Sequence, residues 1–351
     1  MRVCYLLQKT KQTGARSVGE RLGYALTEAG HDVMFMVPNP IDIDHSDPFV
    51  LDGNVHVPTV DLVSAVSIAD PDVLIAHTAN QELVEAMPLI NSMTTTLFRC
   101  GVNLVESHVN GNTGHVQYYP KFIRSFDAIL APSDHAVSKV IGMGVDRERI
   151  YVVRPPMSLD PEEPDLSERA HQVGVVARHS RIKNLPMLAR AIRFYEDEFG
   201  DAPRVLVGGG KSDYEEPLLI EHARGLSIDH KFDLLGWVNP YEAIYSKVKA
   251  TVLPSLSEHF PAVYGEALSA GVPVLAPEAG WSIPPAVYSA DDLGALALEL
   301  KHILEDPATV HAAQMEAAPD GIAMEAAVKD LEKAVVETHE RCDRFTLGAA
   351  V

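Results

Sequence analysis

Short apolar runs that alternate with segments of helical spacing constrain the fold of this chain more than any other feature. The first helical segment, about 16–29, carries Val18, Leu22, Leu26 and Ala29 at steps of four, four and three, and Gly30 is placed to end it. Alternation of strands with helices favours parallel sheets covered on both faces. The strands are expected at 3–7, 33–37, 72–76, 95–98, 126–131 and 149–153, and then at 173–177, 204–207, 232–235, 250–253 and 272–275.

A segment rich in Pro, Asp and Glu, 155–168, separates the two series and is typical of a linker. We therefore expect two doubly wound, Rossmann-like α/β domains facing each other across a cleft. Their expected bounds are 1–156 and 171–351, with 157–170 as the linker. A helix at about 323–341 ends the chain and is a candidate to pack back on the first domain. The cleft is the expected ligand site.

Composition narrows the class of protein. The chain has 351 residues, 46% of them hydrophobic, which is enough for two ordinary domains. A net charge of −20 gives no strong nucleic-acid signal. Three scattered cysteines show no metal-ligand spacing and suggest a reducing compartment. No apolar run reaches the roughly 20 residues that a transmembrane helix needs, and the amino-terminal run is too short for a signal peptide, so a cytoplasmic protein is expected.

Two glutamates in the segment 250–277 stand out. A strand over 250–253 precedes a loop that contains Glu258, and Glu266 is expected on the first turn of a helix over 264–270. Gly271 suits the left-handed end of that helix. Because ligands bind at the carboxyl ends of strands in open α/β sheets, and because helix starts favour anions, both glutamates are placed where a ligand is expected.

Two cations are expected in the loop that opens the second domain. Arg178 and Lys183 follow the strand 173–177, Asn184 can cap the next helix, and Pro186 suits its first turn. Arginine binds two phosphate oxygens at once and lysine supplies a point charge, so the loop suits a diphosphate. The alternative is a solvated basic loop.

The segment 253–277 resembles the glutamate signature of retaining glycosyltransferases of the GT-B fold, in particular the large family four, the glycosyl transferases group one. The matching positions are Glu258, Phe260, Glu266, Ala267, Gly271, Pro273 and Val274. His259 and Pro261 stand where the family usually has glycines, and Pro261 lacks the N–H that relatives can direct at the donor sugar.

The resemblance implies roles for these residues. Arg178 and Lys183 would neutralise the leaving diphosphate, and Glu266 would accept hydrogen bonds from the donor ribose. Glu258 would face the donor sugar or its phosphate side, with His259 and Phe260 beside it in the donor site. The alternatives are a Glu266 that only complements the helix dipole and a Glu258 that is an ordinary surface residue.

Further donor contacts follow from the same resemblance. The run 207–212 is no P-loop, because the required first glycine is replaced by Val205. Gly208 to Gly210 instead match the family's glycine-rich turn, and Gly209 is expected to let backbone approach the nucleotide. Trp237 is expected either to stack on the donor base or to lie in the core, and Gly14 matches a family glycine loop that borders the cleft.

The first domain departs from the family. Relatives often carry His-Gly after the strand that here ends at Phe98, but this chain has Arg99 and Cys100 before Gly101. The substitutes that we consider for the missing histidine are His77, His108 and His115, although a lone histidine is more often structural. Ser133 begins the last helix of this half and matches a family serine, but helix capping explains it equally well. The motif Asp70-Pro71-Asp72 precedes a strand, and we interpret it as a turn and not as a metal motif.

The expected activity is transfer of a sugar from a nucleotide diphosphate sugar to an acceptor hydroxyl. The resemblance implies retention at the anomeric carbon without a metal, so no cofactor is expected besides the donor as co-substrate. A sugar-nucleotide epimerase of the same fold and a non-catalytic nucleotide-sugar-binding relative remain alternatives. The donor base and sugar, the acceptor and the oligomeric state stay open.

Overall fold

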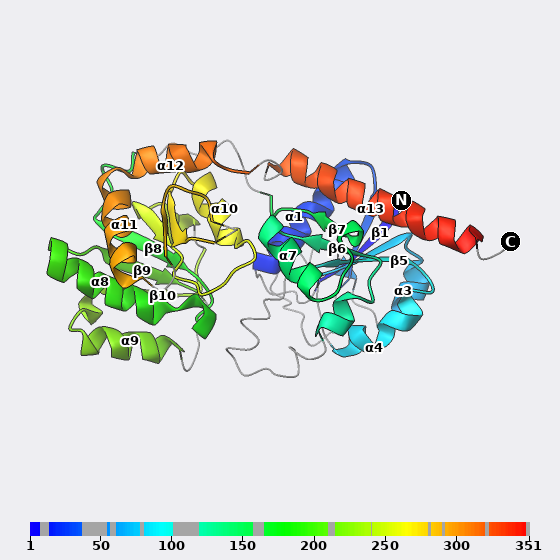
Figure 1. Cartoon of the computed structure of the whole chain (residues 1–351), viewed down its shortest axis with the longest axis horizontal. Coiled ribbons are helices and arrows are strands. Elements are labelled where there is room, and N and C mark those ends of the chain that lie inside the picture. Colours follow the sequence, from blue (N-terminus) through cyan, green and yellow to red (C-terminus); the bar gives the residue numbers. More distant parts are fainter. Residues whose placement is uncertain are drawn as a thin grey trace. The chain divides into compact units, whose positions relative to one another are not determined.

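The chain forms two α/β units, each built on its own parallel sheet (Figure 1). This computed structural model describes residues 1–7, 14–36, 55–56, 61–77, 81–100, 119–156, 165–209, 215–239, 241–279, 282–289, 292–319 and 323–348. Of these, the first unit contains 1–100, 119–156 and 323–348, and the second contains 165–319.

The sheet of the first unit has seven parallel strands in the order β3-β2-β1-β4-β5-β6-β7. The strands are β1 (Arg2–Leu6), β2 (Asp32–Met36), β3 (Val55–His56), β4 (Val73–Ala76), β5 (Thr95–Arg99), β6 (Ala128–Ala131) and β7 (Ile150–Val152). The helices include α1 (Gly14–Glu28), α3 (Leu62–Ala69), α4 (Gln81–Ile90), α7 (Asp134–Gly142) and α13 (Met324–Gly348), with the 3-10 turn η2 (Arg147–Arg149). Residues 119–123 are helical as well. The central strands β1, β4, β5 and β6 are almost wholly buried, because helices cover both faces.

Strands β1, β4 and β5 of the first sheet divide their side chains between its two faces. Cys4, Leu6, Leu74, Ala76 and Phe98 pack with the apolar sides of α3, α4 and α7 in one core cluster. The alternate residues face α1 and α13, as the hydrogen bond between the Thr95 hydroxyl and His339 of α13 shows at 3.1 Å.

The C-terminal helix α13 is part of the first unit (Figure 1). Arg341 donates to the backbone oxygens of Asp127 at 2.9 Å and Glu148 at 3.3 Å. Glu332 lies 3.3 Å from the imidazole of His31, just after α1. These contacts fix α13 along the side of the sheet that α1 also covers.

The sheet of the second unit has six parallel strands in the order β10-β9-β8-β11-β12-β13. They are β8 (Gln172–Val176), β9 (Arg204–Gly208), β10 (Phe232–Gly236), β11 (Ala250–Val252), β12 (Val274–Pro277) and β13 (Val287–Tyr288). The helices are α8 (Leu185–Phe199), α9 (Glu215–Gly225), α10 (Ala262–Ser269), α11 (Leu293–Glu305) and α12 (Pro307–Glu316). Short helical turns are η3 (Arg181–Lys183), η4 (Asp229–Lys231) and the π-helical η5 (Tyr241–Tyr245).

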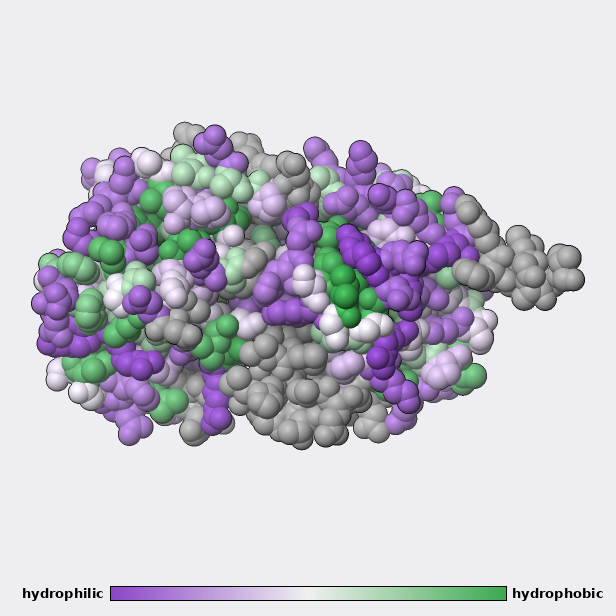
Figure 2. Space-filling model, viewed as in Figure 1, coloured by the Kyte–Doolittle hydropathy of each residue, from purple (hydrophilic) through white to green (hydrophobic). Residues whose placement is uncertain are grey.

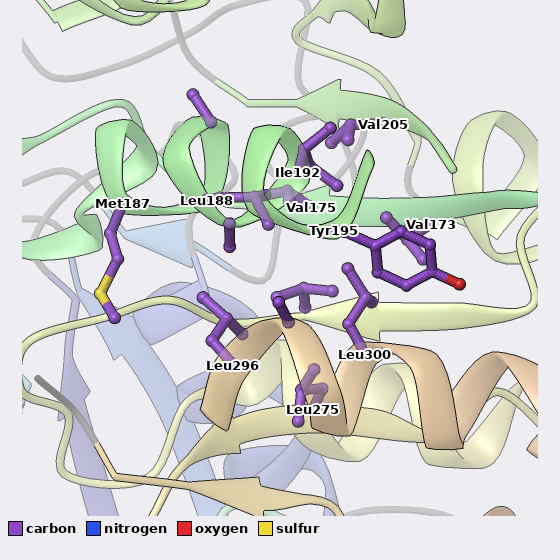
Figure 3. Packing of buried hydrophobic residues seen from close by; sticks show 14 of the residues in the cluster. Val173, Val175, Met187, Leu188, Ile192, Tyr195, Val205, Leu275, Leu296 and Leu300 are labelled. Carbon is purple, nitrogen blue, oxygen red and sulfur yellow. The ribbon is translucent and has the colours of Figure 1, made fainter. Parts of the chain in front are cut away.

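The two faces of this sheet are packed differently. Figure 3 shows α8 and α11 meeting over the strands, with Ile192 and Leu300 among the side chains that fill the space. On the other face η5 lies close to the strands, because Gly174 and Gly208 have no Cβ: one added there would stand 2.4 and 2.6 Å from Ile244. Glycine in these strands therefore serves close packing of the sheet on η5.

Several local predictions are confirmed and two are wrong. Gly30 and Gly271 have φ values of 91° and 71° and end their helices as expected. Asn184 does not cap α8 with its side chain: it adopts the left-handed conformation between η3 and α8 and donates to the sulfur of Met187 at 3.3 Å. The helix that carries Glu266 begins at Ala262, earlier than expected, because Pro261 with φ −73° suits the position before a helix.

A buried glutamine ties α12 to the sheet. The Gln314 side chain accepts from the backbone N–H of Val274 at 2.9 Å and donates to Val274 O at 2.7 Å and Ile283 O at 3.0 Å. Its amide also donates to the hydroxyl of Tyr264 in α10 at 3.2 Å. The four contacts join α12, β12 and α10.

We expect Gln314→Leu to lower the free energy of unfolding by about 2–3 kcal/mol, because it leaves buried backbone groups of β12 without a partner. Guanidinium-induced unfolding measures the change. Glu316→Gln on the exposed side of the same helix is the control, with an expected change below about 0.5 kcal/mol. A stability loss no larger than that of the control would contradict this role.

Candidate functional site

The candidate site lies at the carboxyl ends of β8 and β11, the two central strands of the second sheet. The chain runs from β8 to β9 and β10 on one side of β8, and then returns to β11 on the other side of β8. The strand order therefore reverses between β8 and β11. In open α/β sheets the crevice at such a switch point is where ligands bind. The loop after β8 carries Arg178 and Lys183, and the loop after β11 carries Glu258.

The structure brings two of the expected site residues together across these loops. The Lys183 ammonium donates to Oε1 of Glu258 in an ion pair, with side chains 19% and 13% exposed. The backbone N–H of Leu256 donates to the carbonyl of Ile182 at 2.8 Å, beside the pair. Two loops that lie 75 positions apart in sequence are thus joined by a charged and a backbone contact.

The remaining expected cation, Arg178, lies on the same loop after β8. It follows Ala177, whose N–H donates to Gly208 O at 3.0 Å, and its own side chain is exposed. An exposed guanidinium and a half-buried ammonium on one loop are the kinds of group that bind a multivalent anion.

Glu266 lies in the middle of α10 and not on its first turn as expected. Tyr245 of η5 donates its hydroxyl to Oε2 of Glu266 at 3.4 Å. Burial first, and then the charge of Glu266, raise the pKa of Tyr245 well above its ordinary value, so the phenol stays a proton donor at physiological pH. Sequence reasoning missed Tyr245, because nothing in the pattern around η5 relates it to a glutamate on another helix.

Gly209 packs closely against the backbone at the end of β8. A Cβ at this position would stand 1.7 Å from the carbonyl oxygen of Ala177 and 2.7 Å from its carbon. The N–H of Gly209 donates to Gly236 O at 2.9 Å, which fixes the chain after β9 between two neighbouring strand ends. Gly210 lies outside the described residues.

The aromatic and histidine positions differ in exposure. Trp237, just after the edge strand β10, is 64% exposed, which excludes the core position considered above. His259 is buried, and Phe260 is half-buried with its ring centroid 6.3 Å from that of Tyr264. Figure 2 shows hydrophobic residues only in small areas of a mainly hydrophilic face.

Some of the positions considered in the first unit are described by the structure and others are not. Gly14 is the first residue of α1 and not part of a loop. His77 directly follows β4, Arg99 is the last residue of the neighbouring strand β5, and both are buried. His108 and His115 lie outside the described residues. Ser133 caps α7 by accepting from the N–H of Ala136 at 3.2 Å, which confirms the capping interpretation.

The part of the chain that the structure describes contains neither a metal-binding cluster nor a membrane-spanning helix. Its His, Cys, Asp and Glu side chains form no group of three placed to hold a metal ion. Its helices lack the length or the apolar character needed to cross a bilayer.

The turn at Asp70-Pro71-Asp72 is confirmed, since Asp70 ends α3 with φ 45°. An open hollow beside it, lined by Arg2 and Asp72 among others, lies at the opposite ends of the strands from any expected site residue.

Comparison with known sequences supports the resemblance over the second unit. Residues 170–306 match the model of the family Glycosyl transferases group 1. The matched segment runs from β8 to α11 and contains Arg178, Lys183, Glu258 and Glu266. A search of curated proteins finds no match.

Solved structures resemble the whole chain. HepE (Alr3699) of Anabaena, solved in complex with UDP and glucose, has a TM-score of 0.77 at 17% identity and covers 96% of this chain and 100% of its own. Sucrose-phosphate synthase of Thermosynechococcus elongatus has a TM-score of 0.74 at 17% identity, with both chains fully covered. A glycosyltransferase of Rickettsia africae has a TM-score of 0.73 at 13% identity, covering 96% and 98%.

The predicted fold class is confirmed by these likenesses. Both units are parallel α/β units, as the alternation of strands and helices predicted. The chain has the GT-B glycosyltransferase fold, and its residues 170–306 carry the sequence pattern of the glycosyl transferases group 1.

Proposed function

We propose that this protein transfers a sugar from a nucleotide diphosphate sugar to an acceptor hydroxyl, with retention at the anomeric carbon and without a metal. The observation that carries the proposal is the Lys183–Glu258 pair at the switch point of the second sheet, inside the segment that the family model matches. UDP is the first donor nucleotide to test, because HepE was solved with UDP and with UDP-glucose.

In this proposal the cations of the β8 loop bind the diphosphate. An ammonium has three donors, and Glu258 accepts one from Lys183, which leaves donors for phosphate oxygens while holding the lysine in place. Arg178 adds a fork of donors from the exposed side of the loop. As the bond to the sugar breaks, negative charge grows on the diphosphate, and cations already in position stabilise it without reorganisation.

The other contacts orient the donor. Glu266 accepts hydrogen bonds from the ribose hydroxyls, and Tyr245 holds its carboxylate from the side of the sheet. Trp237 offers an exposed face on which the base stacks. Its strand β10 is separated from β8 only by β9, so the lateral distance is about 10 Å, which a nucleotide diphosphate spans. Glu258, with His259 and Phe260, borders the sugar.

The acceptor attacks from the side on which the leaving group departs. The Glu258 carboxylate is paired with Lys183, and we assign it to positioning the lysine and the donor sugar and not to forming a covalent intermediate. The diphosphate oxygens then accept the proton of the acceptor hydroxyl as the new bond forms. The product keeps the anomeric configuration of the donor.

The test is a reaction of the full chain with UDP-glucose, UDP-galactose and UDP-N-acetylglucosamine against a panel of hydroxyl acceptors. We expect UDP release that depends on an acceptor, and a product that keeps the donor's α configuration by proton NMR. An inverted product would refute retention. An isomerised sugar nucleotide without an acceptor would point to an epimerase, and UDP binding without release from any donor would point to a binding protein.

A further inference from the structure

Three neighbouring strands of the first sheet place a polar cluster at their carboxyl ends. In register, Tyr5 pairs with Ile75 and Ile75 with Leu97, so Tyr5, His77 and Arg99 project from the same face of the sheet. The rings of Tyr5 and His77 lie 6.1 Å apart. The sheet order places β1 beside β4, and this is the switch point of the first sheet.

The cluster is buried, and four of its polar atoms lack hydrogen-bond partners. Arg99 is 4% exposed and His77 is 7% exposed. Nε and Nη2 of Arg99, Nδ1 of His77 and the Tyr5 hydroxyl make no hydrogen bond, and no carboxylate of the described residues forms an ion pair with Arg99. A buried guanidinium without a counter-charge is strongly destabilising, so an anionic partner is expected for it.

The charges around Arg99 support this conclusion. Burial lowers the pKa of Arg99, whereas electrostatic interaction with Tyr5 and Cys100 raises it. Burial raises the pKa of Tyr5 to about 12, so this phenol is neutral at physiological pH. Burial and the charge of Arg99 lower the pKa of His77 well below its ordinary value, so its imidazole is neutral as well. The cluster therefore holds one positive charge and a neutral imidazole.

Helix α1 packs against the face of the sheet from which the cluster projects. A Cβ on Gly19 would stand 2.7 Å from Nδ1 of His77, so only glycine lets the helix approach the imidazole this closely. Gly19 is in the second turn of α1, so the amino end of the helix lies over the ends of β1 and β4. Helix amino ends stabilise anions, and here a buried arginine and a buried histidine lie beside one.

We propose that Arg99, His77 and the amino end of α1 form a binding site for an oxyanion, a phosphate or a carboxylate, carried by the acceptor. The role of the anion as part of the acceptor rests on the proposed function, because the second unit then holds the donor. The anion site itself rests only on the buried cluster. The expected acceptor is thus a small molecule that carries both a hydroxyl and a negatively charged group.

The test is calorimetric titration of the full chain with inorganic phosphate, glycerol 3-phosphate, glycerate and glycerol. We expect the phosphate compounds or glycerate to bind and glycerol not to bind. Whichever of the two, phosphate or carboxylate, binds more tightly identifies the anion. Arg99→Met is expected to weaken that binding at least 30-fold, and Arg99→Lys less, because lysine keeps the charge without the fork. UDP binding is expected to change less than twofold in both variants.

A readout of stability separates binding from a structural role. Without any anion, Arg99→Met is expected to melt at the same temperature as the parent or higher, since it removes an unpaired buried charge. Gly19→Ala is a second variant, in which the new Cβ displaces His77; it is expected to weaken anion binding severalfold while Arg99 remains.

Four results would overturn the site. They are no binding of phosphate, glycerol 3-phosphate or glycerate to the parent protein, unchanged binding in Arg99→Met, a lower melting temperature of that variant, or loss of UDP binding in it. Failure of the proposed function looks different: anions bind through Arg99, but UDP does not bind the parent protein.

Discussion

Lys183→Met is expected to lower kcat/KM for sugar transfer by about 10²–10³-fold, the range seen when one preorganised donor to a developing negative charge is removed. The substitution removes the ammonium from the switch point of the second sheet and leaves Glu258, with 13% of its side chain exposed, without its cation. Because the site is partly solvated, the expected loss of stability is only about 1–2 kcal/mol. Steady-state kinetics and guanidinium unfolding on the same preparation measure the two effects.

The exchanged pair, Lys183→Glu with Glu258→Lys, is the matched control. It restores an ion pair between the two loops, so most of the lost stability is expected to return. Transfer is expected to stay impaired, because the positive charge then stands on the β11 loop and a carboxylate stands where the diphosphate binds. Recovery of transfer together with stability would show that the pair only joins the loops.

Gly209→Ala is expected to destabilise the second unit by at least about 3 kcal/mol, the upper range for overpacking. The new Cβ would stand 1.7 Å from the Ala177 carbonyl oxygen, and this contact is with backbone, so no change of side-chain rotamer relieves it. Relief requires β8 and β9 to separate where Arg178 begins the β8 loop, so donor binding is expected to weaken as well.

Gly225→Ala provides the comparison for this prediction. Gly225 ends α9, and a Cβ there would meet no atom within 4 Å. Its free energy of unfolding is expected to change by less than about 1 kcal/mol. Equal stability of the two alanine variants in guanidinium unfolding would contradict the packing explanation of Gly209.

Much of the fold could be predicted, because parallel strands buried on both faces appear in sequence as continuous apolar runs. The runs around Val173 and Val205 become β8 and β9, with ends within a residue of the expected ones. The very short strands β3 and β13 have no such run and were not expected. Helix starts were less certain: α10 begins at Ala262, where only Pro261 indicated it.

The loops that carry the candidate site residues could be predicted from the sequence, whereas the contacts between those residues could not. The residue types in the loops after β8 and β11 indicated a diphosphate site, but pairing of Lys183 with Glu258 across 75 positions depends on strand order, which no local pattern contains. Trp237 had two explanations, since both a core and a base-stacking site accept an aromatic ring, and only its exposure excludes the first. The role of Gly209 in packing against Ala177 was likewise visible only in three dimensions.

The first unit shows the limit of resemblance. Arg99 and Cys100 precede Gly101 in the segment where relatives often carry His-Gly, and the sequence identified this only as a departure. Its significance lies in burial without a carboxylate partner among the described residues, beside His77 on the next strand. Strand register placed the two side chains on one face, and neither residue alone suggested an anion site.

The central claim is that Arg178 and Lys183 bind the diphosphate of the donor. Calorimetric titration with UDP and with uridine, on the parent protein and on the Arg178→Ala/Lys183→Ala variant, tests it most directly. We expect UDP to bind the parent at least 100-fold more tightly than uridine, and this ratio to fall below about 5 in the variant while uridine binding is unchanged. An equal preference for UDP in both proteins would show that the diphosphate lies elsewhere.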